Sequence, residues 1–359
     1  MICRFSYIGI PQIITLSKVM WYSSYKLNKQ SIFMDTEKLR EKLSLVDREI
    51  ESVFPRHGLP NLNDAVYYHM ETGGKKLRPL LAIATCEALG GSVDQIAPFA
   101  AACEVLHNWF LVHDDIEDGD RVRRDKPAVW VKYGLAHGIN VGDYMAQKVY
   151  ELILRCKEKG VSDGKVFRLI DAMVKTSVST AEGQTMDINL RASDAPAEKQ
   201  YMEMVMGKTG HYLTVTMVGA AIIADREDLI QSLLEFGRAI GPAFQIADDV
   251  LDMTESKGRG EIGRDIKEGK RSIMIIHCLG RCSHSEKERI LEILNKHPED
   301  TTDRDVSFVK ELFGKYGSVG YAKEKTAEME RAALSVADEV PELREILYYF
   351  ADKLVNRRS

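Results

Sequence analysis

Apolar residues recur every three or four positions along this chain from Thr36 to the C-terminus. This is the spacing of side chains on one face of an α-helix, and the alternation typical of half-buried strands is almost absent. The pattern therefore predicts an all-α protein of about ten or more helices in one bundle. Glycine, proline and polar residues interrupt it at residues 55–63, 90–91, 119–127, 160–164, 192–196, 254–269 and 297–303.

Three stretches, residues 97–112, 213–224 and 233–247, are apolar on more than one helical face. Such helices lie inside a bundle or in a membrane. His107 and Gln245 interrupt two of the stretches, and Lys208 precedes the third. These polar residues favour a bundle that surrounds a lined central cavity.

The final helix carries a clear packing signal. Pro341 suits its first turn, and the helix should pack against the body of the protein because its apolar residues fall on one stripe. This stripe of the final helix consists of Leu343, Ile346, Leu347, Phe350, Ala351 and Leu354.

An earlier helix should be capped at its N-terminus by Asp194, just before Pro196.

Residues 1–33 differ from the rest, since they contain no acidic residue and show no helical order. A mis-assigned start is the favoured explanation, with a targeting peptide or a disordered extension as alternatives. Met34 precedes a capped helical opening, so we expect the domain to span residues 34–359. The apolar run at residues 8–19 is shorter than the ~20 residues that span a bilayer, and we expect no stable membrane insertion.

Composition sets further limits. The formal net charge of −5 over 359 residues gives no general attraction to nucleic acid. Six scattered cysteines do not form a disulfide framework. They favour a reducing, cytoplasmic location.

Two acidic clusters share one pattern, DDIED at residues 114–118 and DDVLD at residues 248–252. Aspartates four positions apart on a helix project from the same face. Six aspartates close together need positive charge nearby, and oxygen ligands favour Mg²⁺, which readily shares its coordination with phosphate. The clusters therefore predict two walls of one site for Mg²⁺ and a diphosphate. The expected metal residues are Asp114, Asp115, Asp118, Asp248, Asp249 and Asp252.

A basic group complements these acids. The sequence GGKKLRP at residues 73–79 places Lys75 and Arg78 three positions apart on one face of an opening helix, where both would bind one anion. His107 lies two turns before Asp114 on the same helical face. Two further cations, Arg123 and Arg124, follow the first acidic cluster.

Taken together, in this order and spacing, these motifs resemble the trans-type isoprenyl diphosphate synthases from about residue 45 to the C-terminus, especially the archaeal short-chain enzymes. The resemblance implies a Mg²⁺-dependent prenyltransferase that extends dimethylallyl, geranyl or farnesyl diphosphate with isopentenyl diphosphate. It also implies about three Mg²⁺ ions, a homodimer, and farnesyl or geranylgeranyl diphosphate as product.

The resemblance also implies residue roles. Lys75, Arg78, His107 and Arg124 match residues that bind isopentenyl diphosphate, and Arg123, Lys208 and Lys270 match those that bind the allylic diphosphate. Thr209 and Gln245 match groups that stabilise the allylic cation, and Gln184 and Asp187 match a further motif. Trp109 and Phe110 match the bulky residues that limit product length.

Two positions depart from the family pattern: Lys76 stands where arginine is common, and Gly260 replaces a usual lysine, for which Arg259 or Lys257 would substitute. Other interpretations are a terpene cyclase, a non-catalytic regulatory subunit, and a metal-dependent phosphohydrolase suggested by His113-Asp114. The cyclase usually lacks the second aspartate cluster and the Lys75 to Arg78 anion site. The regulatory subunit usually loses acidic residues, and the phosphohydrolase leaves the second cluster unexplained.

Overall fold

We describe residues 36–253 and 262–356 of a computed structural model. From Lys38 onward the chain forms one compact unit. Nearly all of its regular structure is α-helical, which confirms the predicted fold class. The predicted extension at residues 1–33 and the substituted positions Lys257, Arg259 and Gly260 lie outside the described residues.

The first part of the unit contains helices that follow the predicted breaks closely. One loop holds a short antiparallel pair, β1 (Val122–Arg123) with β2 (Lys126–Pro127), in which Val122 pairs with Pro127. The sequence pattern missed this hairpin because its strands are only two residues long. The helices are α2 (Thr36–Val53), α3 (Asn63–Met70), α4 (Leu77–Ala88), α5 (Val93–Glu117), α6 (Val129–Tyr133), α7 (Leu135–Arg155) and η1 (Cys156–Lys159).

The remaining elements include one irregular turn that matters for the site, the π-helix η2 (Met206–Gly210). It interrupts what would otherwise be one helix formed by its two neighbours. The others are α8 (Asp163–Arg191), α9 (Glu198–Val205), α10 (His211–Ile223), η3 (Glu227–Leu229), α11 (Ile230–Asp252), α12 (Arg264–Lys267), α13 (Ile273–Leu279), α14 (His284–Leu294), η4 (Pro298–Asp300), α15 (Asp303–Tyr316), α16 (Ser318–Asp338) and α17 (Arg344–Val355).

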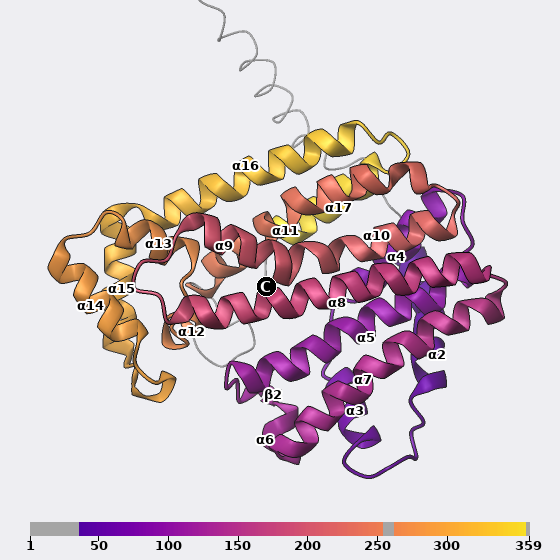
Figure 1. The fold of residues 1–359 in the computed structure, drawn as a ribbon, viewed down its shortest axis with the longest axis horizontal. Coiled ribbons are helices and arrows are strands. Elements are labelled where there is room, and N and C mark those ends of the chain that lie inside the picture. Colours follow the sequence, from indigo (N-terminus) through magenta and orange to yellow (C-terminus); the bar gives the residue numbers. More distant parts are fainter. Residues whose placement is uncertain (1–35, 254–261, 357–359) are drawn as a thin grey trace, which may run out of the picture. The chain divides into compact units, whose positions relative to one another are not determined.

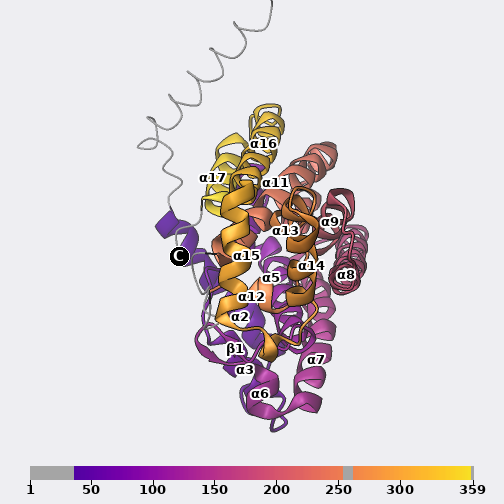
Figure 2. The ribbon, with the colours of Figure 1, turned by 90° about the vertical axis from the view of Figure 1, so that its left-hand side faces the viewer.

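The stretches that are apolar on several faces lie in the interior of the bundle. Helix α5 packs against α4, α7 and α10, and α11 packs against α10, α16 and α17 (Figures 1 and 2). Gly219 of α10 faces the Phe99 ring of α5, and a Cβ at Gly219 would lie 2.0 Å from that ring. The close approach of these two helices therefore requires glycine at this position.

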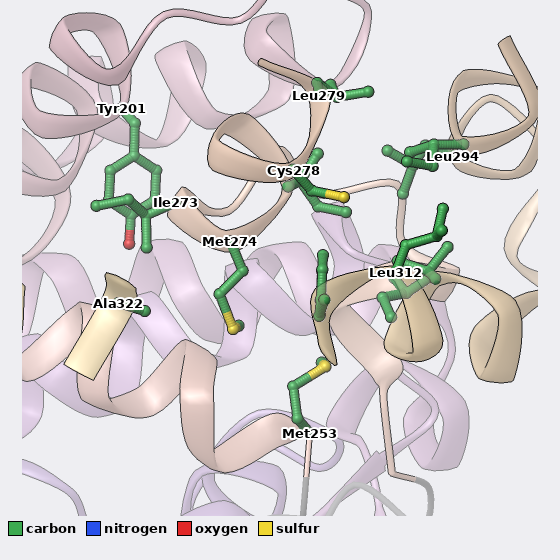
Figure 3. Close-up of a cluster of buried hydrophobic side chains, with 14 of the residues drawn as sticks. Tyr201, Met253, Ile273, Met274, Cys278, Leu279, Leu294, Leu312 and Ala322 are labelled. Carbon is green, nitrogen blue, oxygen red and sulfur yellow. The ribbon is translucent and has the colours of Figure 1, made fainter. Parts of the chain in front are cut away.

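A second cluster of buried side chains joins α9 and the helices from α13 to α16 (Figure 3). It includes Tyr201, Ile273, Cys278, Leu312 and Ala322, all at most 5% exposed. This cluster holds the C-terminal helices against the end of α11. The acidic residues at the end of α11 therefore adjoin a closely buried apolar core.

The final helix confirms one prediction and corrects another. All six residues of the predicted apolar stripe are buried. The helix begins at Arg344 rather than near Pro341, which lies in the preceding turn. The cap predicted at Asp194 is also wrong, because α9 begins at Glu198, after Ala197.

Candidate active site

One cavity of about 520 Å³ collects most of the predicted site residues. Its walls come chiefly from α5, α8, η2 and α11. The predicted residues that line it are Arg78, His107, Trp109, Phe110, Asp114, Arg123, Arg124, Gln184, Asp187, Lys208, Thr209, Gln245, Asp248, Asp249 and Lys270. Those that do not line it are Lys75, Asp115, Asp118 and Asp252.

The first acidic cluster ends α5, and its carboxylates differ in burial and in partners. Asp114 lines the cavity, whereas Asp118 is buried and accepts a hydrogen bond from Arg191 Nη2 at 2.6 Å. Asp115 is also buried, and its Oδ1 accepts from Arg123 Nε at 2.7 Å. Asp114 and Asp118 lie one helical turn apart as predicted, with the Asp118 N–H donating to the Asp114 carbonyl at 2.8 Å. Asp118, however, is surrounded by cations of the protein and does not line the cavity.

Asp118 is strongly favoured as a carboxylate. Burial alone would raise its pKa, but Lys270, Lys208 and Arg191 together hold the pKa of Asp118 well below its ordinary value. Lys270 Nζ lies 3.5 Å from Asp118 Oδ2. The negative charge of Asp118, the last residue of the first acidic cluster, is thus already neutralised by cations of the protein.

The second acidic cluster, at the end of α11, also divides. Asp248 and Asp249 line the cavity, while Asp252 is fully buried and accepts a hydrogen bond from the Asp265 backbone N–H at 3.1 Å. Asp249 accepts hydrogen bonds from Tyr201 Oη at 2.7 Å and Gln245 Nε2 at 3.0 Å. Asp252 therefore connects α11 to the start of α12 and does not face the cavity.

A polar chain fixes the orientation of Gln245. Thr209 Oγ1 donates to Gln245 Oε1 at 3.1 Å, while the Gln245 amide nitrogen donates to Asp249. The amide oxygen of Gln245 therefore points towards η2 on the opposite wall. Thr209 and Gln245, paired in the sequence interpretation, also meet in the structure.

Lys208 of η2 lies between the acidic groups of α5 and α8. Its Nζ is 3.3 Å from Asp114 Oδ1 and 3.1 Å from Asp187 Oδ2. Burial would lower the pKa of Lys208, but Asp114, Asp187 and Asp118 raise it above its ordinary value, so the ammonium stays charged. Gly183 of α8 makes this possible, because a Cβ there would lie 2.2 Å from the Lys208 backbone nitrogen.

The basic end of the cavity is built around Tyr212. The Arg78 guanidinium donates to the Tyr212 hydroxyl and lies 4.2 Å from the centre of its ring. The same hydroxyl is 3.1 Å from His107 Nδ1. Burial, with Arg78 and Arg124 adding to it, holds the pKa of His107 well below its ordinary value. The imidazole is therefore neutral and offers a hydrogen bond rather than a positive charge.

Lys75 does not join this group in the structure. It is exposed and precedes α4, which begins at Leu77, and the intervening Lys76 has a φ of +45°. The prediction that Lys75 and Arg78 share a helical face is therefore wrong. Arg124 takes the neighbouring place, donating to Thr72 Oγ1 at 3.1 Å and to the Gly73 carbonyl.

Two aromatic residues that were expected to limit product length both line the cavity. The rings of Trp109 and Phe110 are stacked, with centroids 4.6 Å apart. Tyr212 meets Phe110 edge to face, with centroids 6.2 Å apart. The apolar part of the cavity therefore lies beside the basic end, one turn before Asp114 on α5.

Sequence reasoning missed three residues of this site. Arg191 links Asp118 to Asp187, Tyr201 supports Asp249, and Tyr212 joins Arg78 to His107. Arg191 lies four residues after Asp187 on α8, a spacing that predicts an ion pair. The partners of both tyrosines come from distant segments, and no local spacing indicates them.

The polyprenyl synthetase family model matches residues 59–311. The geranylgeranyl diphosphate synthase of Methanosarcina mazei is 33% identical over 327 residues, covering 89% of this chain and 97% of that protein. A short chain isoprenyl diphosphate synthase of Methanothermobacter thermautotrophicus is 34% identical over 338 residues, covering 92% of this chain and 97% of that protein.

The fold comparison agrees. The crystal structure of geranylgeranyl pyrophosphate synthetase from Pyrococcus horikoshii superposes with a TM-score of 0.80 at 32% identity, covering 90% of this chain and 98% of that one. The all-α bundle is thus the isoprenoid synthase fold. The chain belongs to the polyprenyl synthetase family.

Proposed function

We propose that this protein is a Mg²⁺-dependent short-chain prenyltransferase that joins isopentenyl diphosphate to an allylic diphosphate. One observation carries this proposal: Asp114 of α5 and Asp248 of α11 line the same cavity as the basic group at Arg78 and the aromatic pair at Trp109. The cavity thus combines carboxylates, cations and an apolar wall. A substrate with a charged diphosphate and a hydrocarbon tail needs all three.

The carboxylates fit Mg²⁺ because every donor is an oxygen. Asp114, Asp248 and Asp249 would hold the metal from the cavity walls, and Asp115 Oδ2 is a buried oxygen without a hydrogen-bond partner. Among the described residues, no three carboxylate, histidine or cysteine side chains converge on one point. In this proposal, diphosphate oxygens would serve as further ligands in a set of about three ions. Bound Mg²⁺ would supply positive charge that stabilises the leaving diphosphate.

Different residues of the protein bind the two substrates and stabilise the cation. In this proposal Lys208, Lys270 and Arg123 bind the allylic diphosphate beside the acidic clusters. Arg78, Arg124 and neutral His107 hold isopentenyl diphosphate at the basic end, with exposed Lys75 reaching it from outside the cavity wall. Thr209 and Gln245 direct oxygen dipoles towards the cation that forms between the two substrates.

The reaction follows from these positions. The allylic carbon–oxygen bond breaks, and its electron pair leaves with the diphosphate. The double bond of isopentenyl diphosphate attacks the allylic cation, and the new cation loses a proton to the departing diphosphate. One elongated allylic diphosphate and one inorganic diphosphate result.

Product length is set, in this proposal, by the stacked rings of Trp109 and Phe110. Their position one turn before Asp114 limits how far a hydrocarbon tail extends from a diphosphate bound at the acidic clusters. This supports farnesyl or geranylgeranyl diphosphate as the end product.

We also propose a homodimer that pairs through α8. Phe167, Val174 and Val178 lie along one face of this helix and are 71%, 41% and 53% exposed. A row of large apolar side chains on a long helix suits a second copy of the same surface. Val174→Glu should convert the dimer to a monomer in light scattering, whereas Lys175→Glu, at an exposed neighbouring position, should not.

A cytoplasmic location belongs to the same proposal. All five cysteines within the described residues are free thiols. Free buried thiols suit a reducing compartment. Independently of the location, none of the described helices is long and apolar enough to cross a membrane.

The stoichiometry of release tests the proposed function. With both substrates and Mg²⁺, the synthase should release one inorganic diphosphate for each isopentenyl unit incorporated, and none with either substrate alone. Release of phosphate from a single substrate would instead identify a phosphohydrolase. No release under any condition would favour a regulatory subunit.

A further inference from the structure

The indole nitrogen of Trp109 has a specific partner one turn further along α5. Trp109 Nε1 donates a hydrogen bond to His113 Nδ1 at 3.3 Å, and the two rings meet edge to face. A tryptophan that leaves the solvent usually requires such a partner for its N–H. This bond restricts the orientation of the Trp109 ring in the cavity.

His113 is itself fixed by the neighbouring helix α7, which packs along α5 (Figure 1). Because Nδ1 accepts from Trp109, the proton of the neutral imidazole lies on Nε2. Nε2 is 3.3 Å from the Ile139 carbonyl, to which it donates. The more distant Asp143 carboxylate is 3.7 Å from the same nitrogen and 68% exposed.

Space for this imidazole comes from a glycine on α7. A Cβ at Gly142 would lie 2.0 Å from His113 Nε2 and 2.2 Å from its Cδ2. Any side chain at this position would therefore displace the ring. Glycine on one helix thus determines how the histidine on the other helix presents Nδ1 to Trp109.

The Trp109–His113 hydrogen bond affects the cavity because the Trp109 ring is stacked on a second ring. Trp109 stacks on Phe110 with an angle of 24° between the rings, and both rings line the cavity. An indole released from His113 would gain other rotamers and would no longer hold Phe110 in one orientation. The depth available to a hydrocarbon tail would then vary between molecules.

We infer that His113 is a positioning residue for product length, acting through the Trp109 indole and held in place by Ile139 and Gly142. This inference rests on the proposed prenyltransferase function. His113 touches neither diphosphate group in this account. Its effect belongs in the ratio of longer to shorter products, which is independent of the overall rate.

The test compares variants that keep or remove the acceptor. His113→Asn retains an oxygen near the position of Nδ1, whereas His113→Phe retains the ring but offers no acceptor. We expect His113→Phe to raise the ratio of the next longer product to the main product about three- to tenfold, the change that corresponds to one hydrogen bond. His113→Asn should stay within about twofold of the wild type.

Two further variants separate this role from general damage to the fold. Gly142→Ala leaves His113 and Trp109 unchanged in sequence but displaces the imidazole, and it should reproduce the shift of His113→Phe. In a Trp109→Phe background, which has no indole N–H, His113→Phe should cause no further shift. His137→Phe, an exposed position on α7 that does not line the cavity, is the matched control and should leave the ratio unchanged.

The outcomes distinguish the inference from the function on which it rests. If the wild type does not elongate any allylic diphosphate, the proposed function fails. If the wild type elongates but His113→Asn shifts the ratio as much as His113→Phe, the inference is wrong. An equal shift from His113→Phe with and without the Trp109 indole would also overturn it. If His113→Phe does not fold, Gly142→Ala takes its place. A ratio of longer to shorter products that is the same in Gly142→Ala and His113→Asn would then overturn the inference.

Discussion

Lys208 Nζ lies 3.3 Å from Asp114 Oδ1, although the two residues come from η2 and α5 and are far apart in the sequence. The contact places a permanent cation against the carboxylate that faces the cavity. It also shows how the protein tolerates so many acids in one place. Asp115, Asp118, Asp187, Asp249 and Asp252 likewise each have a cation or a hydrogen-bond donor of the protein beside them.

The first prediction concerns this carboxylate. Asp114→Asn removes the negative charge that faces both Lys208 and the proposed metal site, so we expect the elongation rate to fall about 10²- to 10³-fold. Rate constants at saturating substrate measure the effect. Asp143→Asn, which alters an exposed aspartate of α7, should retain the wild-type rate. An Asp114→Asn variant with near wild-type turnover would contradict the assigned role.

A second prediction concerns ligand binding in the absence of turnover. Mg²⁺ together with inorganic diphosphate should raise the midpoint of thermal unfolding more than either alone, because each completes the binding site of the other. At 100 times the dissociation constant the stabilisation is about 2.7 kcal/mol. Asp248→Asn should abolish this gain. The same shift in wild type and Asp248→Asn would show that the ions bind elsewhere.

Removing the aromatic wall should lengthen the product. We expect Phe110→Ala and Trp109→Ala each to move the main product towards longer chains, because either change deepens the apolar part of the cavity. Chromatography of the dephosphorylated products gives the length directly. Phe308→Ala removes a half-buried phenylalanine of α15 outside the cavity lining and serves as the control. Unchanged lengths in both cavity variants would place the limit elsewhere.

Stability should respond to pH through Asp305, far from the cavity. Lys296 and Arg289 donate hydrogen bonds to this carboxylate at 2.8 and 2.9 Å. The hydroxyl of Thr302, the N-cap residue of α15, also donates to it. The Lys296 hydrogen bond, with help from Thr302, lowers the pKa of Asp305 to about 2. Since the unfolded value is about 4, the carboxylate stabilises the fold above pH 4 and loses this effect as the pH falls towards 2.

Asp305→Asn should therefore lower the free energy of unfolding by about 1–3 kcal/mol at pH 7. The difference from wild type should narrow between pH 4 and pH 2. Chemical denaturation at several pH values measures both quantities. Asp303→Asn changes a neighbouring carboxylate that is 97% exposed, and it should cost at most about 0.5 kcal/mol. A difference that is constant across this pH range would show that Asp305 does not act through its charge.

The sequence predicted the helical fold and the family because both depend on local spacing. Apolar periodicity survives in nearly every helix, and loops rich in glycine and proline separate most of them where expected. The predicted start of the final helix failed because Pro341 lies in a turn before Arg344. Proline suits a helix start and a turn equally well, and only packing decides between them.

The sequence indicated candidate residues for the site, but it did not indicate how their side chains are placed. Helical spacing placed Asp114 and Asp118 one turn apart, as the structure has them, but it did not predict that Arg191 of α8 binds Asp118. Lys75 was misplaced because the left-handed backbone at Lys76 breaks the expected helical start. Tyr201 and Tyr212 were missed because contacts between distant helices leave no mark in local sequence.

The most direct test measures incorporation of labelled isopentenyl diphosphate into longer allylic diphosphates by the purified chain, with Mg²⁺ and with a chelator in its place. We expect elongation only with Mg²⁺, ending at farnesyl or geranylgeranyl diphosphate. No elongation with any allylic starter, or equal elongation in the presence of the chelator, would show that this protein is not a Mg²⁺-dependent prenyltransferase.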